Sequence, residues 1–224
     1  MGNTPTPLRE TVRADDVNRA ERMLSNKTSE SRAKLINEDY SPDCILDSCK
    51  RVDGNALYYA VERNRVKMVE LFLKHGGDIH SLGRYDETLL HCCGRVHGNV
   101  KLAKILIEHG ADLKATDDLG RYPIHSASSS GFFNKTPFIE YLLSTMNEAD
   151  ARDYLNIKDF YGNTPLMTAV NAENIPVTQS LQLLGADDTI VNNNGQTAFD
   201  IAKERKAEMM EILESKQRLT DNSN

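Results

Sequence analysis

Apolar residues recur at helical spacing in short stripes along the chain, and each stripe stops at a glycine. Three of these stripes align with one another: Met68–Ile79 (MVELFLKHGGDI), Leu102–Leu113 (LAKILIEHGADL) and Val177–Asp188 (VTQSLQLLGADD). Apolar positions three and four residues apart predict a helix with one buried face. Glycine just past such a stripe is typical of a helix C-terminus, because glycine adopts the left-handed conformation at little cost. The pattern therefore predicts three short helices, each followed by a turn.

A second, shorter apolar motif precedes these stripes and recurs elsewhere in the chain. Thr or Asn at its first position, followed by Pro, is a strong signal for a helix start. Thr164–Pro165 has both features, whereas Tyr122–Pro123 keeps the proline without a capping oxygen. Each motif predicts the first helix of a pair whose second helix is the longer stripe. The motif begins at Asn55, Thr88, Tyr122, Thr164 and Thr197.

The spacing of these motifs indicates a repeat. Leu57, Leu90 and Ile124 follow one another at intervals of 33 and 34 residues, and Leu166 and Phe199 are 33 residues apart. A turn plus two helices that recur at about 33 residues is the signature of the ankyrin repeat. Such units fold only when stacked, because one pair cannot bury its apolar face alone.

The sequence resembles the ankyrin repeat family over most of its length. The resemblance is carried by Asn163–Leu166 (NTPL), Pro123–His125 (PIH), Leu90–His91 (LH) and the Gly-Ala-Asp runs at Gly110 and Gly185. It implies an all-α solenoid of helix-turn-helix units with projecting β-turns. In this family the turns and the concave face of first helices hold partner proteins.

We expect a single domain over residues 1–218, built of about six units whose terminal members act as caps, followed by a tail at 219–224. The units span approximately 5–24, 53–80, 86–114, 120–157, 162–189 and 195–214. A polar insert covers 25–51, and a shorter insertion falls within 128–137 and 144–155. Because long loops tend to be functional or disordered, we hypothesise that the 25–51 insert closes one end of the binding groove.

The turn tips carry aromatic and arginine side chains that folding does not require at those positions. Tyr and Arg are enriched among residues that dominate binding energy, so the tips are predicted to contact a partner. The alternative, that they pack on the neighbouring turn and close the edge, stays open. The predicted contact residues are Arg84, Tyr85, Asp118, Leu119, Arg121, Phe160, Tyr161, Tyr59, Arg63 and Arg95. Further outward positions are expected at Glu62, Cys92, Ser126, Ser128, Thr168, Asn171, Asn193 and Asn194.

Composition narrows the class of protein. Hydrophobic residues make up 39% and charged residues 27%, which argues against general disorder. No apolar run approaches the roughly 18 residues of a membrane span. The start MGNTPTPLRE lacks a secretory signal. We expect a cytoplasmic protein, with the nucleus, or the host cytosol for a bacterial or viral effector, as alternatives. The net charge of −6 argues against a nucleic-acid partner and accommodates a neutral or basic one more easily.

Two groups of cysteines raise the question of a metal site. Cys92 and Cys93 lie near His91 and His97 in the sequence. Cys44 and Cys49 form a second pair of cysteines. Zinc sites usually need two ligand pairs on segments that can wrap the ion. We interpret His91 as the structural histidine that the resemblance implies, and Cys93 as a core residue. The thiols are expected to be reduced, because no secretory signal accompanies them.

Motifs for catalysis are missing from the sequence. It contains no G-x-S-x-G, no G-x-x-x-x-G-K-[ST] and no G-x-G-x-x-G. Asp78, Asp112 and Asp187 recur in the same place of the repeat, so they belong to turns and are not an acid and base pair. We expect no enzymatic activity and no cofactor.

The leading prediction is a monomeric, non-catalytic protein–protein interaction module that acts as an adaptor or an inhibitor. One alternative is a membrane-tethered recruiter, since MGNTPT matches the loose pattern for N-myristoylation at Gly2. Pro5 and Pro7 fit that pattern poorly, and one acyl chain alone binds membranes only marginally. The other alternative is a small zinc-binding protein.

Overall fold

The computed structural model describes residues 8–38, 54–129, 134–205, 210 and 212–214. These residues form short helices joined by turns, and the β pairing among them is an isolated bridge between Leu82 and Thr88. They group into two compact units. Unit 1 takes Met1–Cys93 and Lys101–Asp112, and unit 2 takes Gly94–Val100 and Leu113–Asn224. The all-α prediction is confirmed, whereas the single domain over 1–218 stays a prediction.

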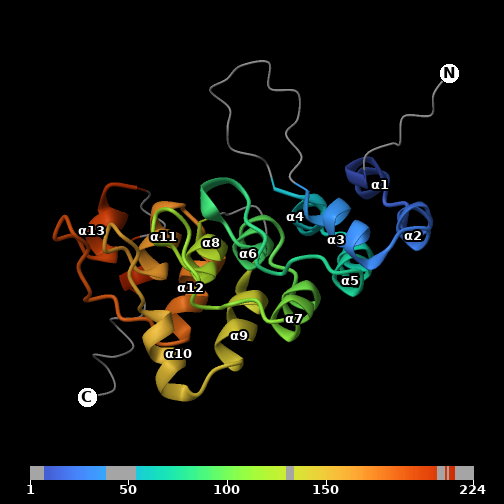
Figure 1. The fold of residues 1–224 in the computed structure, drawn as a ribbon. Coiled ribbons are helices and arrows are strands. Elements are labelled where there is room, and N and C mark those ends of the chain that lie inside the picture. The colour runs from blue at the N-terminus through green and yellow to red at the C-terminus, as the bar shows by residue number, and fades with distance from the viewer. Residues whose placement is uncertain (1–7, 39–53, 130–133, 206–209, 211, 215–224) are drawn as a thin grey trace. The chain divides into compact units, whose positions relative to one another are not determined.

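Unit 1 is built on stacked helix pairs (Figure 1). Helix α1 packs on α2 and α4 packs on α5, while α1 also contacts α4 and α2 contacts α5. Leu8, Leu24, Leu57 and Phe72 are fully buried between them. The helices are α1 (Leu8–Ala14), α2 (Val17–Ser25), α3 (Ser29–Asn37), α4 (Ala56–Glu62), α5 (Val66–Lys74), the 3-10 turn η1 (Arg84–Asp86), and most of α6 (Leu89–Val96) and α7 (Val100–Glu108).

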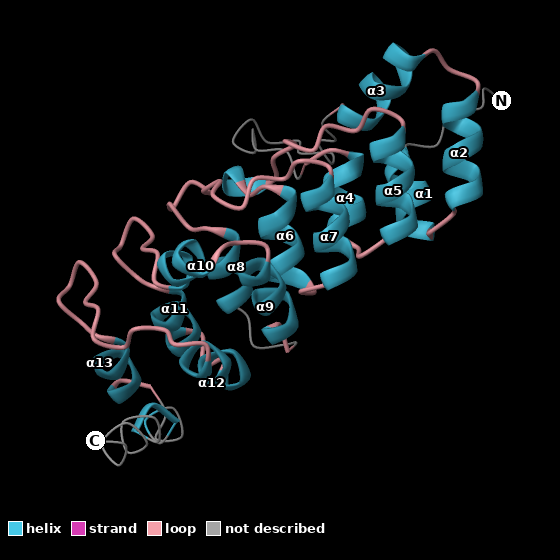
Figure 2. Cartoon of the chain, turned by 90° about the horizontal axis from the view of Figure 1, so that it is seen from below, coloured by secondary structure: helices cyan, strands magenta, loops and turns pink. Residues whose placement is uncertain are grey.

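Unit 2 repeats this arrangement in the second half of the chain. First helices α8, α11 and α13 pack in a row, and second helices α9 and α12 pack against each other and on their own partners. In Figure 2 the loops that precede α11 and α13 project to the same side. The helices are α8 (Pro123–Ser128), α9 (Thr136–Ser144), α10 (Glu148–Leu155), α11 (Pro165–Asn171), α12 (Ile175–Leu183) and α13 (Ala198–Lys203).

Capping residues set where these helices begin and end. Thr164 accepts a hydrogen bond from the N–H of Met167 at 3.3 Å, and Pro165 occupies the first turn of α11. Both features satisfy or remove N–H groups that a helix start leaves without partners. At the other end the three glycines of the aligned stripes have φ of 90°, 94° and 93°, at Gly76, Gly110 and Gly185. The predicted left-handed C-terminal caps are therefore confirmed.

Helices also form inside the two insertions. In the 25–51 insert, the N-cap residue of α3 is Thr28, whose hydroxyl accepts a hydrogen bond from the N–H of Ser31 at 3.3 Å. The remainder of that insert from 39 onward lies outside the described residues, together with Cys44 and Cys49. In the second insertion, α10 has Asn147 as its N-cap residue and packs against α9. Residues 130–133, Gly2 and the tail at 219–224 also lie outside the described residues.

Candidate partner-binding surface

Three turns of unit 2 share one construction, in which a polar side chain accepts two hydrogen bonds from its own turn. Before α11, Asp159 Oδ1 accepts from the backbone N–H groups of Tyr161 (2.9 Å) and Asn163 (2.8 Å). Asp117 and Asn192 take the same part in the turns before α8 and α13. Side-chain oxygens that bond the backbone two residues on stabilise a turn locally. The bases of all three turns are thus held in one shape.

Hydrogen bonds also join each of these turns to the next. The backbone N–H of Phe160 donates to the carbonyl of Leu119 at 3.1 Å, and that of Asn193 donates to the carbonyl of Tyr161 at 3.0 Å. The side-chain amide of Asn193 donates to the carbonyl of Phe160 at 2.9 Å. These bonds place the three tips side by side along one edge of unit 2. The edge therefore presents its outward side chains as a single surface.

The aromatic side chains on this edge are exposed. Phe160 is 69% and Tyr161 is 59% exposed to solvent. A Cβ added at Gly120 would lie only 2.2 Å from the ring of Phe160, so this ring rests on the backbone of the neighbouring turn. Phe160 therefore fits both hypotheses, packing on a neighbouring turn and contact with a partner. Part of its ring packs on the turn that contains Gly120, and most of the side chain remains exposed to solvent. Large exposed aromatic groups are typical of binding surfaces.

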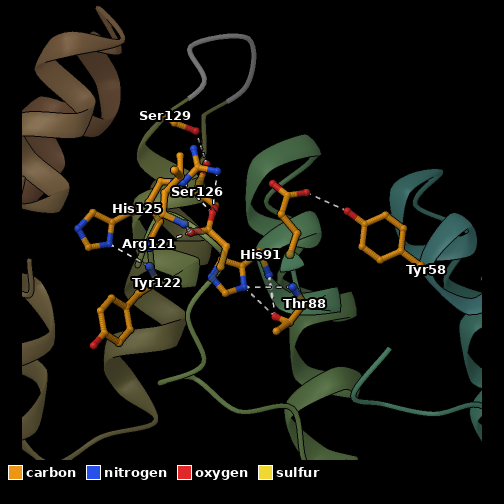
Figure 3. Close-up of polar contacts among 11 residues, drawn as sticks. Tyr58, Thr88, His91, Arg121, Tyr122, His125, Ser126 and Ser129 are labelled. Carbon is orange, nitrogen blue, oxygen red and sulfur yellow. Dashed lines mark hydrogen bonds and ion pairs between the residues drawn. The ribbon is translucent and has the colours of Figure 1, made fainter. Parts of the chain in front are cut away.

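The corresponding turn of unit 1, at Arg84–Asp86, is anchored by a buried hydrogen bond. Glu87 is only 4% exposed, and its Oε2 accepts a hydrogen bond from the hydroxyl of Tyr58 at 2.8 Å, as Figure 3 shows for Tyr58. Burial raises the pKa of Tyr58 above its usual value, so the hydroxyl stays protonated as the donor. Above this anchor, Tyr85 is 53% exposed with φ of 60°, and Asp86 has φ of 57°. Two successive left-handed residues other than glycine mark a strained tip, which is common at functional sites.

Most of the predicted contact residues reach solvent. Arg121 is held in place because it donates to Asp117 at 2.7 Å, and the side chain of Asp117 is fully buried. Arg63 lies over the ring of Tyr59, 5.1 Å from its centroid. Exposed among the predicted residues are Arg84, Tyr85, Phe160, Tyr161 and Arg63. Half-buried among them are Asp118, Leu119, Arg121 and Arg95.

Four expected outward positions are wrong. Tyr59 is only 5% exposed, and the side chains of Cys92, Ser126 and Ser128 are also buried. The reason is the shortness and crowding of the first helices. Helix α4 has 7 residues and packs on α1, α3 and α5, and α8 has 6 residues and packs on α9 and α11. Almost every side chain on such a helix meets a neighbour, so the solvent-facing stripe is narrower than the repeat pattern suggested.

A groove lies in unit 2 between the projecting turns and the first helices. Its volume is about 530 Å³. The expected outward residues Thr168 and Asn171 of α11 line its floor, and Tyr161 and Leu119 line it from the turn tips. The remaining lining is rich in amides and charged groups: Arg121, Asp159, Asn163, Asn192, Asn194, Gln196, Glu204 and Arg205. Met167, Ala172 and Ile201 add apolar groups to the lining. The groove therefore combines apolar surface with polar groups that can fix the orientation of a ligand, as specific binding sites do.

Several groove residues were missed by sequence reasoning. Asn163 and Gln196 stand directly before the N-cap residues of α11 and α13, as Arg121 does before α8. The repeat register places these three residues equivalently, so extending the argument from Arg121 would have found the other two. Arg205 follows the end of α13, and its role in the groove depends on a contact with Asn171 that no local pattern signals.

His125 joins two of the turns through the interior of unit 2. The backbone N–H of Tyr122 donates to its Nδ1 at 3.2 Å, as Figure 3 shows. Nδ1 is therefore the acceptor, and Nε2 carries the proton that it donates to the carbonyl of Asn163 at 3.0 Å. The imidazole is fully buried, and burial lowers its pKa to about 4. His125 thus serves as a neutral connector between the start of α8 and the turn before α11.

His91 has the equivalent local contact in unit 1. The backbone N–H of Thr88 lies 3.3 Å from its Nδ1 and the Thr88 hydroxyl lies 2.8 Å from the same atom (Figure 3). These contacts tie His91 to the start of its own helix, which fits a structural role. Cys92 and Cys93 are buried and are not joined in a disulfide. Within the described part of the chain, no group of three or more His, Cys, Asp or Glu side chains could hold a metal ion.

None of the helices that the structure describes is long and apolar enough to span a lipid bilayer. The acylation hypothesis rests on Gly2, which is not among the described residues.

Comparison with known proteins identifies the class. A sequence model for ankyrin repeats, in three copies, matches residues 22–117 and 90–190. The chain belongs to the ankyrin repeat family, and the family resemblance and the all-α repeat fold are thereby confirmed. Ankyrin repeats are protein–protein interaction modules, so the protein carries such a module.

Three curated relatives match this chain over about two thirds of its length. Ankyrin repeat protein nuc-2 of Neurospora crassa is 32% identical over 158 residues, which cover 70% of this chain and 14% of that protein. Tyrosine-protein kinase Shark of Drosophila melanogaster is 28% identical over 67% of this chain and 15% of its own length. Cyclin-dependent kinase inhibitor 2A of Monodelphis domestica is 25% identical over 65% of this chain and 79% of its own length. The chain thus spans only a small share of the first two.

Proposed function

We propose that this chain is a non-catalytic interaction module that binds a partner protein through the turn tips and the adjoining groove of unit 2. The observation that carries the proposal is the combination of exposed Phe160 and Tyr161 with a groove of about 530 Å³ directly beside them. Hydrogen bonds between turns hold the edge in place before binding. A pre-organised surface binds more tightly, because less conformational entropy is lost on association.

The module acts as an adaptor or as an inhibitor that covers its target. The likeness to cyclin-dependent kinase inhibitor 2A supports the inhibitor role, because that protein matches over most of its own length. The proposed complex is 1:1, formed by a monomeric chain that holds its partner in this groove.

The test begins with the partner itself. The tagged full chain is used to isolate bound proteins from the native source, and the affinity of the purified partner is then measured by calorimetry. We expect the double variant Phe160→Ala and Tyr161→Ala to bind at least about tenfold more weakly, since aromatic contacts of this kind commonly contribute about 2 kcal/mol or more. Adding Tyr85→Ala shows whether the contact extends to the turn of unit 1.

Leu183→Ala is the matched control. Leu183 is an apolar residue on α12 that is 87% exposed and does not line the groove. This variant is expected to bind like the wild type. Undiminished affinity in the Phe160 and Tyr161 double variant would refute the proposed surface, and an equal loss in the control would show that the effect is not specific to the tips.

A further inference from the structure

We propose that the groove of unit 2 selects an extended acidic segment of the partner, with a carboxylate at Arg205 and Asn171 and a backbone carbonyl at Asn163. This inference rests on the proposed function and deepens it by naming the chemistry of the bound segment. It follows from the direction in which the amides of the groove are held.

The orientation of Asn192 sets that of Asn163. Asn192 Oδ1 accepts hydrogen bonds from the backbone N–H groups of Asn194 and Gln196, both at 3.0 Å. Because backbone N–H groups only donate, this oxygen must face them and the Asn192 amide nitrogen must face the other way. That nitrogen donates to Asn163 Oδ1 at 3.0 Å. The amide NH2 of Asn163, which lines the same groove, is therefore left as a donor.

The orientation of Asn171 is determined in the same way. The guanidinium of Arg205 donates to Asn171 Oδ1. A guanidinium has donors only, so the oxygen of Asn171 must face Arg205 and its NH2 group is presented as a donor. Asn171 and Arg205 are both exposed, and both line the groove. Together they offer adjacent N–H groups that suit a carboxylate.

The charged side chains of the groove differ in which partners they already have. Arg121 is paired with the buried Asp117 at 2.7 Å. Asp159 already accepts two backbone N–H groups through Oδ1, and Glu204 accepts from the side-chain amide of Gln196 at 3.4 Å. For Arg205, by contrast, no carboxylate among the residues that the structure describes forms an ion pair. Among the described residues that line the groove, Arg205 is thus the cation that no carboxylate pairs with.

The overall charge of the chain does not oppose this assignment. The net charge of −6 favoured a neutral or basic partner when the sequence alone was considered. Exposed charges farther away than about 8 Å are largely screened at physiological ionic strength. A short acidic segment therefore responds mainly to the groups of the groove itself, where Arg205 attracts its carboxylate while Asp159 and Glu204 disfavour a carboxylate beside them. The apolar tips Leu119 and Tyr161 then pack against the neighbouring part of the same segment.

The experiment selects a ligand without assuming one. Random displayed peptides of about ten residues, which span roughly 35 Å when extended, are selected on the intact chain. The strongest binder is synthesised with a fluorescent label, and its dissociation constant is measured by anisotropy. We expect Asp or Glu to be enriched among the selected peptides. The version of the same peptide with Asn or Gln in place of Asp or Glu should bind at least about tenfold more weakly.

Variants of the chain assign the contact. Arg205→Gln removes the cation. Asn171→Asp is nearly isosteric, but its carboxylate pairs with Arg205 and so neutralises it. Each variant should lower the affinity for the peptide at least about tenfold. Lys203→Gln is the matched control, because Lys203 is an exposed cation on α13 outside the groove. It should bind like the wild type. Arg205→Glu should in turn recover affinity for a peptide whose acidic residue is changed to Lys.

Each outcome decides the proposal. Failure to select any peptide, selection without acidic enrichment, or unchanged affinity in Arg205→Gln would overturn it. Failure of the proposed function would look different, because the native partner would then bind the Phe160 and Tyr161 double variant normally. Loss of the native partner in that double variant with full retention in Arg205→Gln would sustain the turn surface and refute the acidic segment.

Discussion

The stability of unit 2 should depend on pH through His125. This histidine is fully buried, accepts from the N–H of Tyr122 and donates to the carbonyl of Asn163. Protonation would place a second N–H on Nδ1, directly against the donor of Tyr122. The folded state therefore resists protonation of the ring, and the pKa of His125 lies at about 4 instead of 6.5.

The size of the effect follows from this difference in pKa. Between pH 6.5 and pH 4 the unfolded chain binds a proton that the folded chain does not. The free energy of unfolding must then fall as the pH falls through this window. The contribution of the neutral His125 ring to that free energy is fully present above pH 6.5. At about 1.4 kcal/mol per pKa unit, the loss from His125 is about 2 kcal/mol at pH 5 and about 3 kcal/mol at pH 4.

Urea unfolding followed by circular dichroism measures this loss. His125→Gln removes the titrating ring, and Gln at this position can still accept from the backbone N–H at the helix start. We expect the variant to lose about 1–3 kcal/mol at neutral pH, because the carbonyl of Asn163 loses its donor. Between pH 8 and pH 5, the wild type should then lose about 2 kcal/mol more than His125→Gln. His80→Gln, which changes an exposed histidine, should follow the wild type. Parallel pH curves for the wild type and His125→Gln would refute the reasoning.

Two further predictions concern packing. Leu106→Ala, at a fully buried position of α7, should lower the free energy of unfolding by about 2–5 kcal/mol in denaturant titrations, and an unchanged midpoint would contradict the helix register. Gly110→Ala should cost about 1–2 kcal/mol, since this glycine has φ of 94° and open space around it. Gly120→Ala should cost more, because its φ is 70° and its new Cβ would collide with Phe160. Equal losses at the two glycines would show that the ring of Phe160 does not rest on Gly120.

The helix pairs, their caps and the repeat were predictable because their signals are local. Apolar spacing, an N-cap oxygen at Thr164 and a glycine at Gly185 act within a few residues of one another, and all appear in the structure as expected. The exposed tips at Phe160 and Tyr161 were predictable for the same reason, since a turn between two helices must project. Helix α10 was recognised only as extra length in the repeat, because its sequence lacks a strong apolar stripe.

Burial on the first helices could not be read from the repeat. Tyr59 and Ser126 were expected to point outward from the first helices, yet both are buried, on helices that pack against several others. The burial of a side chain depends on everything that surrounds it, and a sequence pattern reports only the face toward its nearest partner.

The sequence by itself determined that this protein is a stack of short helix pairs with projecting turns, and with it the class of function. Only the tertiary structure decided which groups the groove presents. The donor at Asn163 is set by Asn192, 29 residues away along the chain, and the one at Asn171 by Arg205, 34 residues away. Helix spacing and capping act between near neighbours in the chain, whereas the direction of an amide is fixed by whichever donor the fold brings against it.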